Sequence, residues 1–311
     1  MFMKKHNQLD FKLLNINKSD YDKSEDKLFK SEKSVCEITK YVNENPTPWN
    51  LDHIYDYSDE DFDIAVERGY IEKIMCEDFS KHFEKFTKKE LILQSQSFID
   101  PEISKGDVIK LLAEEGEYSW VITDKGLSYL NSNPLYVFFT NHLLKYNLYE
   151  FVLFARANDG LDLEELGDKY INLKLEKSLT GNYLNYIDYY HTLYLKNGDY
   201  YNALVYLIQR IIYLTNSWLL EDYHVAFDEV YDLETFYLLF NFTKLNLDLD
   251  FENAYKNAFN EFKIPELRIN YNRLHDISYR LLINGEDQYE ISGDLLEESK
   301  KEGKFKSFSF F

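Results

Sequence analysis

Three aspartates at alternate positions, Asp59, Asp61 and Asp63 in the run DEDFD, are residues whose type and spacing suggest chemistry. A calcium loop of the EF-hand kind begins this way, but it also needs a glycine at its sixth position and a glutamate at its twelfth. Ile64 stands where the glycine is required, and no glutamate stands at the twelfth position. We therefore expect an exposed acidic helix start here.

Other familiar catalytic and metal-binding patterns are missing from the sequence. His53 lies near Asp52 and Asp56, but no second histidine is spaced to complete a metal site. The chain has no Gly-rich phosphate loop and no Gly-x-Ser-x-Gly elbow. Its two cysteines, Cys36 and Cys76, form no CxxC pair. The sequence favours a protein without metal, cofactor or catalytic residues.

One pair of residues resembles a catalytic motif. The run RINYNRLHDISYR contains Arg268 and His275 separated by six residues, a spacing that resembles the Arg-to-His motif of HEPN ribonucleases. The resemblance implies that both lie on one helix, where the arginine steadies a phosphate and the histidine serves in acid–base catalysis. A HEPN-like ribonuclease is therefore one alternative function.

The charge of the chain limits its partners. The 311 residues include 55 Asp and Glu against 35 Lys and Arg, a net charge of −20. No long basic stripe is present, and broad contact with a nucleic-acid backbone normally requires one. Nucleic acid is disfavoured as a partner, and attraction to a basic protein fits the charge better.

The composition favours long helices. The chain has 27 Tyr and 23 Phe but only 11 Gly and 5 Pro, a balance typical of helices that pack through aromatic rings. The codon bias of an AT-rich genome would raise the aromatic content as well. The most apolar stretch, PLYVFFTNHLLKYNLYEFVLFA, is interrupted by polar residues, so we expect no membrane helix and a cytoplasmic location.

The pattern along the chain predicts a mainly α-helical protein in four parts. Residues 1–33 are rich in charge, Asn and Ser and are expected to be a flexible arm. Residues 34–132 are expected to form a small helical module with a short β element, residues 133–300 an α-helical domain, and residues 301–311 an aromatic, basic tail.

Local signals place the elements of the module. We expect a short helix over 35–42, a strand at YSWVI, and a helix capped by Thr123 in TDKGLSYL. Gly69 suits the left-handed position after a helix. Capping boxes predict three further helices, at Ser58 with Asp61, at Thr87 with Glu90 and at Ser104 with Asp107.

Residues 50–130, with the runs KFTKKELILQSQSF, ISKGDVIKLLAEEG and ITDKGLSYL, resemble a known kind of module. They are similar to the SAP-type helix–loop–helix segment of uncharacterised phage and prophage proteins of low-GC bacteria, and a winged helix is the close competitor. The resemblance implies a sequence-specific DNA-binding regulator that uses residues 86–130, a further alternative function. The basic residues available to it are Lys88, Lys89, Lys105, Lys110 and Lys125.

The segment YIDYYHTLYLKNGDYYNALVYLIQRIIYLTN resembles a tetratricopeptide-type helix hairpin. Tyr190 and Tyr194 lie one turn apart, NGDYYNA makes the turn, and Ala203 lets two helices approach. A single hairpin cannot bury its own apolar face, so neighbouring helices must stack on it. Only one copy is evident, and we expect a repeat-like or bundle domain.

The tail KKEGKFKSFSFF combines lysines with phenylalanines. Two interpretations stay open: an edge strand, or a peptide with aromatic anchors. We expect it to dock on the acidic helical domain of the same chain, with an external partner as the alternative.

Together these observations predict a non-enzymatic, acidic interaction protein of phage or mobile-element origin. We expect it to bind and inhibit a host protein that handles nucleic acid or serves in defence. The predicted partner-binding residues are Tyr190, Tyr194, Tyr200, Phe305, Phe308, Phe310 and Phe311.

Overall fold

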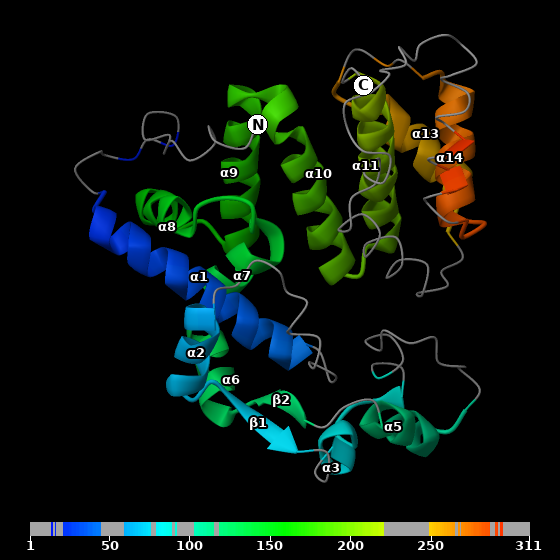
Figure 1. Cartoon of the computed structure of the whole chain (residues 1–311). Coiled ribbons are helices and arrows are strands. Elements are labelled where there is room, and N and C mark those ends of the chain that lie inside the picture. The colour runs from blue at the N-terminus through cyan, green and yellow to red at the C-terminus, as the bar shows by residue number, and fades with distance from the viewer. Residues whose placement is uncertain are drawn as a thin grey trace, which may run out of the picture. The chain divides into compact units, whose positions relative to one another are not determined.

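A computed structural model gives the structure of the chain (Figure 1). It describes residues 21–44, 59–75, 79–88, 103–114, 118–220, 249–264 and 269–286, with a few single positions before, between and after them. These ranges contain twelve helices and two strands, which confirms the expected mainly α class. The chain divides into two compact units, residues 1–173 and 174–311, whereas the sequence suggested a boundary near residue 133.

The first unit is organised around α1 (Lys23–Glu44), the long blue helix of Figure 1. It packs against α2 (Asp59–Glu67), α6 (Asp124–Ser132), α7 (Pro134–His142) and α8 (Leu148–Ala157). The apolar side chains that α1 buries recur at helical spacing, as expected for a helix with one face in a core. They are Phe29, Val35, Cys36, Ile38 and Val42.

Helix α1 begins earlier than the sequence suggested, so residues 23–33 are helical although we expected a flexible arm there. Asp22 caps the helix: its carboxylate accepts the backbone N–H of Ser24 at 2.7 Å. The hydroxyl of Tyr149 on α8 accepts the N–H of Asp22 at 3.1 Å and donates to Glu25 at 2.7 Å. The charged run therefore forms a helix start held by a buried tyrosine 127 positions later in the chain.

A small sheet joins two distant segments of the first unit. Strand β1 (Ile71–Met75) pairs antiparallel with β2 (Tyr118–Ile122), with Ile71 opposite Ile122. The predicted strand at 118–122 is confirmed, whereas β1 was missed. Between the strands, α3 (Phe79–Phe83) and α5 (Lys105–Glu114) pack on each other around an apolar cluster. The cluster consists of Phe83, Leu91, Val108, Ile109 and Leu112.

Two of the predicted helix caps can be compared directly with the structure. The Ser104 hydroxyl accepts the N–H of Asp107 at 3.1 Å and donates to the Asp107 carboxylate at 2.6 Å, which confirms this helix start. Thr123 caps α6 by accepting the N–H of Gly126 at 3.0 Å. Ser58 and Glu90 lie outside the described residues.

Thr123 also holds the corner at which β1 begins. Its N–H donates to the Tyr70 carbonyl at 3.0 Å, and its hydroxyl donates to the Gly69 carbonyl at 2.7 Å. Gly69 has a φ of +68°, the left-handed conformation expected after α2. The VERGY and ITDKG runs, more than fifty residues apart, therefore meet in one corner.

Helix α9 (Leu163–Lys177) follows α8. Its Tyr170 donates to the Glu150 carboxylate of α8 at 2.5 Å, and both side chains are buried. Among the described residues, the rings of Tyr146, Phe151 and Phe154 contact the Tyr170 ring. A buried carboxylate is tolerated here because a hydrogen bond satisfies it.

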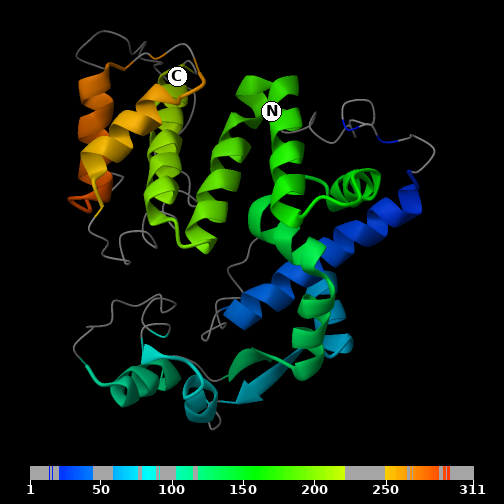
Figure 2. The same cartoon turned by 180° about the vertical axis from the view of Figure 1, so that it is seen from behind.

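The second unit is built on a helix hairpin (Figure 2). Helix α10 (Leu179–Lys196) and helix α11 (Tyr200–Leu220) pack along one another, and the turn between them contains Gly198 with a φ of +74°. This confirms the hairpin, but the turn is shorter than the predicted NGDYYNA, because residues 200–203 already belong to α11. Helices α13 (Phe251–Asn260) and α14 (Tyr271–Leu282) pack against α11 and complete the apolar core.

Ser278 provides a stability test of this core. Its side chain is fully buried on α14, and among the described residues its hydroxyl has no hydrogen-bond partner. We expect Ser278→Ala to raise the free energy of unfolding of the second unit by about 1 kcal/mol. Urea unfolding followed by circular dichroism measures this change.

Thr215→Val is the matched control for Ser278→Ala. Thr215 is also fully buried, but its hydroxyl donates to the Ile211 carbonyl at 2.7 Å. Thr215→Val removes an existing hydrogen bond, so we expect it not to raise the free energy of unfolding. Equal effects of the two substitutions would contradict the account of Ser278.

No helix among the described residues is both long and apolar enough to cross a membrane.

Candidate functional site

The hairpin of the second unit carries a cluster of tyrosines. Tyr186, Tyr190 and Tyr194 follow one another at intervals of one turn along α10, and Tyr206 reaches them from α11. The Tyr190 and Tyr206 ring centroids lie 5.1 Å apart, with planes 20° from parallel, and those of Tyr194 and Tyr206 lie 5.7 Å apart at 23°. We call these four residues the tyrosine ladder.

One rung of the ladder already holds a cation. The ammonium of Lys263 lies 3.9 Å from the centroid of the Tyr186 ring, well within the range of a cation–π interaction. The backbone fixes this position, because the N–H of Lys263 donates to the Tyr183 hydroxyl at 2.9 Å. The arrangement shows that the Tyr186 ring accepts a positive charge.

The ladder is accessible at its outer rungs. Tyr186 is 7% exposed, whereas Tyr190, Tyr194 and Tyr206 are half-buried. Burial raises the pKa of Tyr206, and its neighbour Tyr186 adds to the rise. The Tyr206 phenol therefore stays neutral at physiological pH and can both donate and accept hydrogen bonds. Half-exposed phenols with a polar tip are typical of protein interfaces.

The structure brings two of the predicted partner-binding residues together. Tyr190 and Tyr194 belong to the ladder, whereas Tyr200 begins α11 and lies outside it. Tyr186 and Tyr206 were missed. The one-turn spacing of Tyr186 before Tyr190 was a usable signal, but the position of Tyr206 depends on the register of the hairpin. The predicted Phe305, Phe308, Phe310 and Phe311 lie outside the described residues.

Beneath the ladder, α10 and α11 are joined by buried polar groups. The Arg210 guanidinium, with a side chain 1% exposed, forms an ion pair with Asp188. His191 is also buried, and its Nδ1 lies 2.8 Å from the Ala203 carbonyl oxygen, which fixes the close approach of the helices at Ala203. These contacts position the ladder by fixing its two helices.

His191 makes the second unit sensitive to acid. Burial lowers the pKa of the imidazole from 6.5 to about 4. The unfolded chain therefore binds more protons between pH 6.5 and 4, and stability is full above pH 6.5 and lost as the pH falls toward 4. We expect a loss of about 3 kcal/mol from this group over that range.

The test of this prediction is urea unfolding at a series of pH values. His191→Asn keeps an amide that can donate to the Ala203 carbonyl but does not titrate. We expect the variant to have a flatter stability profile between pH 6.5 and 4 than the parent chain. Parallel profiles for the two proteins would contradict the assignment.

Some of the lysines predicted to bind nucleic acid make contacts within the first unit. The Lys105 ammonium donates to the Glu84 carbonyl at 2.9 Å and so ties α5 to the end of α3. Lys125 lies 5.8 Å from the centroid of the Tyr70 ring. Lys110 is exposed, and Lys88 is half-buried. Lys89 lies outside the described residues.

The two residues of the HEPN-like motif cannot be compared in space. Arg268 lies outside the described residues, whereas His275 lies on α14. The Nε2 atom of His275 is 3.0 Å from the Glu252 carboxylate. Its ring packs against aromatic neighbours, with the Tyr255 centroid 4.7 Å away. In the described residues, His275 therefore has a carboxylate and aromatic rings as its neighbours.

Comparison with known proteins gives no relative. No protein-family model, no curated protein and no solved structure matches the chain. Within the part of the chain that the structure describes, no group of three or more His, Cys, Asp or Glu could hold a metal ion.

Proposed function

We propose that this chain is a non-enzymatic interaction protein that binds a basic segment of a protein partner through the tyrosine ladder. The observation that carries the proposal is the Lys263 ammonium on the face of Tyr186, 3.9 Å from its centroid. The same chemistry would accept Lys or Arg side chains of a partner on Tyr190, Tyr194 and Tyr206. The net charge of −20 supports a basic partner, since it attracts positive and repels negative surfaces.

The biological setting that we propose is a phage or mobile element. It rests on the resemblance of residues 50–130 to phage and prophage proteins. In this setting the partner is a host protein that handles nucleic acid or serves in defence, and binding inhibits it. Proteins that bind nucleic acid present basic surfaces, which an acidic protein with a cation-accepting ladder can cover.

The finer architecture is also a proposal. A SAP-like or winged-helix-like module over residues 34–132 is supported by the antiparallel pairing of β1 and β2 and by α3 and α5 between them. A tetratricopeptide-like hairpin is supported by Ala203, which is fully buried where α10 and α11 meet. We assign the module to structure or protein contact, because Asp107 and Asp124 lie beside its lysines.

Affinity capture from cells, with and without nuclease treatment, tests the function. We expect a stoichiometric protein that survives the nuclease, and we expect a chain with Tyr190→Ser and Tyr194→Ser to lose it. Leu179→Ser is the matched control, because Leu179 is an exposed apolar residue of the same helix outside the ladder. Circular dichroism establishes that all three chains remain folded.

The proposal would be overturned if the captured material is mainly nucleic acid, or if the captured protein is lost on nuclease treatment. Either result would favour a DNA-binding protein that uses residues 86–130. Retention of the captured protein by the tyrosine double variant would reject the ladder as the binding surface.

A further inference from the structure

Helix α14 presents a second aromatic surface, separate from the tyrosine ladder. Tyr271, His275, Tyr279 and Ile283 follow one another at intervals of four residues and so share one side of the helix. Tyr271, Tyr279 and Ile283 are 41%, 38% and 50% exposed, high values for large apolar side chains. We call these four residues the α14 face.

The rings of the α14 face form a regular series. The His275 centroid lies 6.5 Å from that of Tyr271 and 6.2 Å from that of Tyr279, with planes 23° and 17° from parallel. From α13, the Phe251 ring packs edge-on against His275 and Tyr279. The series is therefore supported from below by α13.

One carboxylate of α13 lies beside the α14 face. Glu252 lies beside His275, and its side chain is 71% exposed. A carboxylate has about four acceptor sites, so Glu252 can bind a further cation while it contacts His275.

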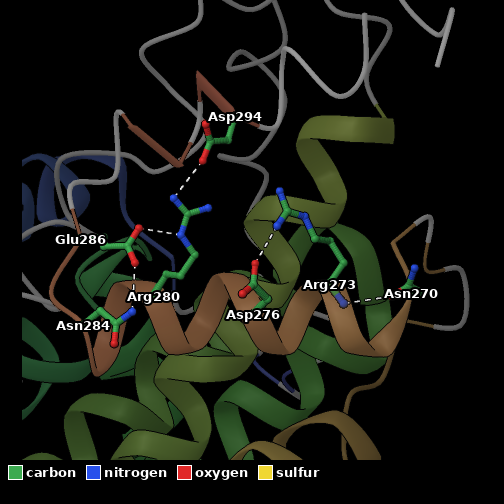
Figure 3. Close-up of polar contacts among 7 residues, drawn as sticks. All are labelled: Asn270, Arg273, Asp276, Arg280, Asn284, Glu286 and Asp294. Atoms are coloured by element: carbon green, nitrogen blue, oxygen red, sulfur yellow. Dashed lines mark hydrogen bonds and ion pairs between the residues drawn. The ribbon is translucent and has the colours of Figure 1, made fainter. Parts of the chain in front are cut away.

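Contacts on another side of α14 bring the end of the described chain to this helix. Arg280 donates to Glu286 at 2.6 Å and to Asp294 at 2.9 Å (Figure 3). Asp294 is the last described residue, and residues 295–311 follow it. Those residues are therefore tethered to α14 itself.

We propose that residues 304–310 of the same chain dock on the α14 face in an extended conformation. In an extended chain, alternate side chains point the same way, about 6.6 Å apart. Phe308 and Phe310 then share a side, and their spacing matches the 6.5 and 6.2 Å between the rings of the α14 face. The two phenylalanines fit against three successive rings.

The charge of the segment and the length of the chain that leads to it agree with this placement of Phe308 and Phe310. Lys304 and Lys306 lie on the same side of the extended segment as Phe308 and Phe310, where Lys306 can reach Glu252. The fourteen residues from Asp294 to Phe308 can span up to about 45 Å, whereas the twelve residues of α14 extend only about 18 Å. The tether gives the segment an effective concentration on the order of 1 mM at the face.

The test uses a fluorescein-labelled peptide of residues 300–311 and the full chain. In the parent chain the face is occupied by the chain's own segment. In a full chain with Phe308→Ser and Phe310→Ser the face is vacant. We expect the peptide to bind this variant at least about tenfold more tightly than the parent, as measured by fluorescence anisotropy.

Two further variants identify the surface. Addition of Tyr271→Ser and Tyr279→Ser to the tail-substituted chain should abolish peptide binding, whereas addition of Leu179→Ser should leave it unchanged. The proposal is overturned if the parent and the tail-substituted chain bind the peptide equally. It is also overturned if the tail-substituted chain fails to bind at about 1 mM peptide.

Dilution distinguishes docking within one chain from docking between two copies. Occupation within one chain blocks the parent equally at all protein concentrations, whereas occupation by a second copy weakens on dilution. A concentration-dependent block would overturn the intramolecular proposal. The inference is independent of the ladder's partner, because the peptide assay contains no other protein.

Discussion

Gly126→Ala is expected to destabilise the first unit by about 3 kcal/mol or more. A Cβ at this position would lie 2.1 Å from the Tyr70 carbonyl oxygen and 2.8 Å from the Ile122 side chain. The carbonyl cannot easily move, because the N–H of Thr123 donates to it at 3.0 Å. The substitution must therefore open the corner that joins β1 to α6.

Gly106→Ala is the matched control, since Gly106 lies in α5 of the same unit. The nearest atom to its added Cβ is the Ser104 hydroxyl oxygen at 3.8 Å, an ordinary contact. Because alanine favours a helix over glycine, we expect this variant to be neutral or more stable by up to about 1 kcal/mol.

Urea unfolding followed by tryptophan fluorescence measures both glycine variants. Trp120 of β2 packs edge-on against Phe62 of α2, with the centroids 4.8 Å apart, and so reports on the region beside the corner. A Gly126→Ala chain with the unfolding midpoint of the parent would contradict the close approach of Gly126 to the Tyr70 carbonyl.

The corner illustrates how far sequence reasoning extends. The spacing of Thr123 before an apolar helix predicts a cap, and the structure confirms it. The sequence around position 126 does not predict that glycine is required there, because the atom that a Cβ would meet belongs to Tyr70. Strand β1 was missed for a related reason: its partner Tyr118–Ile122 lies more than forty residues away.

Helix α1 demonstrates the limit of composition as a guide. Its first turns are rich in charge and were expected to be flexible, yet Tyr149 and Phe29 stack with centroids 5.0 Å apart. The Glu32 carboxylate also accepts hydrogen bonds from Arg68 at 2.6 Å and from Tyr129 at 3.1 Å. Tertiary contacts from distant residues therefore determine where this helix begins.

In the candidate surfaces, too, local features could be predicted from the sequence, and contacts between distant segments could not. Residues four apart on one helix share a side, so the pairing of Tyr190 with Tyr194 could be predicted. The contributions of Tyr206 and Lys263 depend on how α11 and the segment after α13 return to α10, and no local pattern encodes that. The function predicted from the sequence rested on the net charge and on the absence of catalytic motifs, not on a recognised site.

Asp188→Ala is expected to destabilise the second unit by about 3–5 kcal/mol, because it deprives the buried Arg210 guanidinium of its carboxylate. Loss of the pair should also loosen the hairpin beneath the tyrosine ladder. The free energy of unfolding, from urea titration followed by circular dichroism, measures the first effect.

The double variant Asp188→Ala with Arg210→Met separates a buried charge from lost packing. Met places an apolar chain of similar length where Arg210 is buried, and replacement of both members of a buried pair is often neutral or stabilising. We therefore expect it to recover most of the stability that Asp188→Ala loses. If the double variant is as unstable as the single one, the ion pair acts through specific hydrogen bonds of Arg210, and the hairpin requires the guanidinium itself. If the double variant recovers the stability of the parent, the ion pair adds no net stability to the fold. In that case α10 and α11 are held together mainly by apolar packing around Ala203 and Leu207.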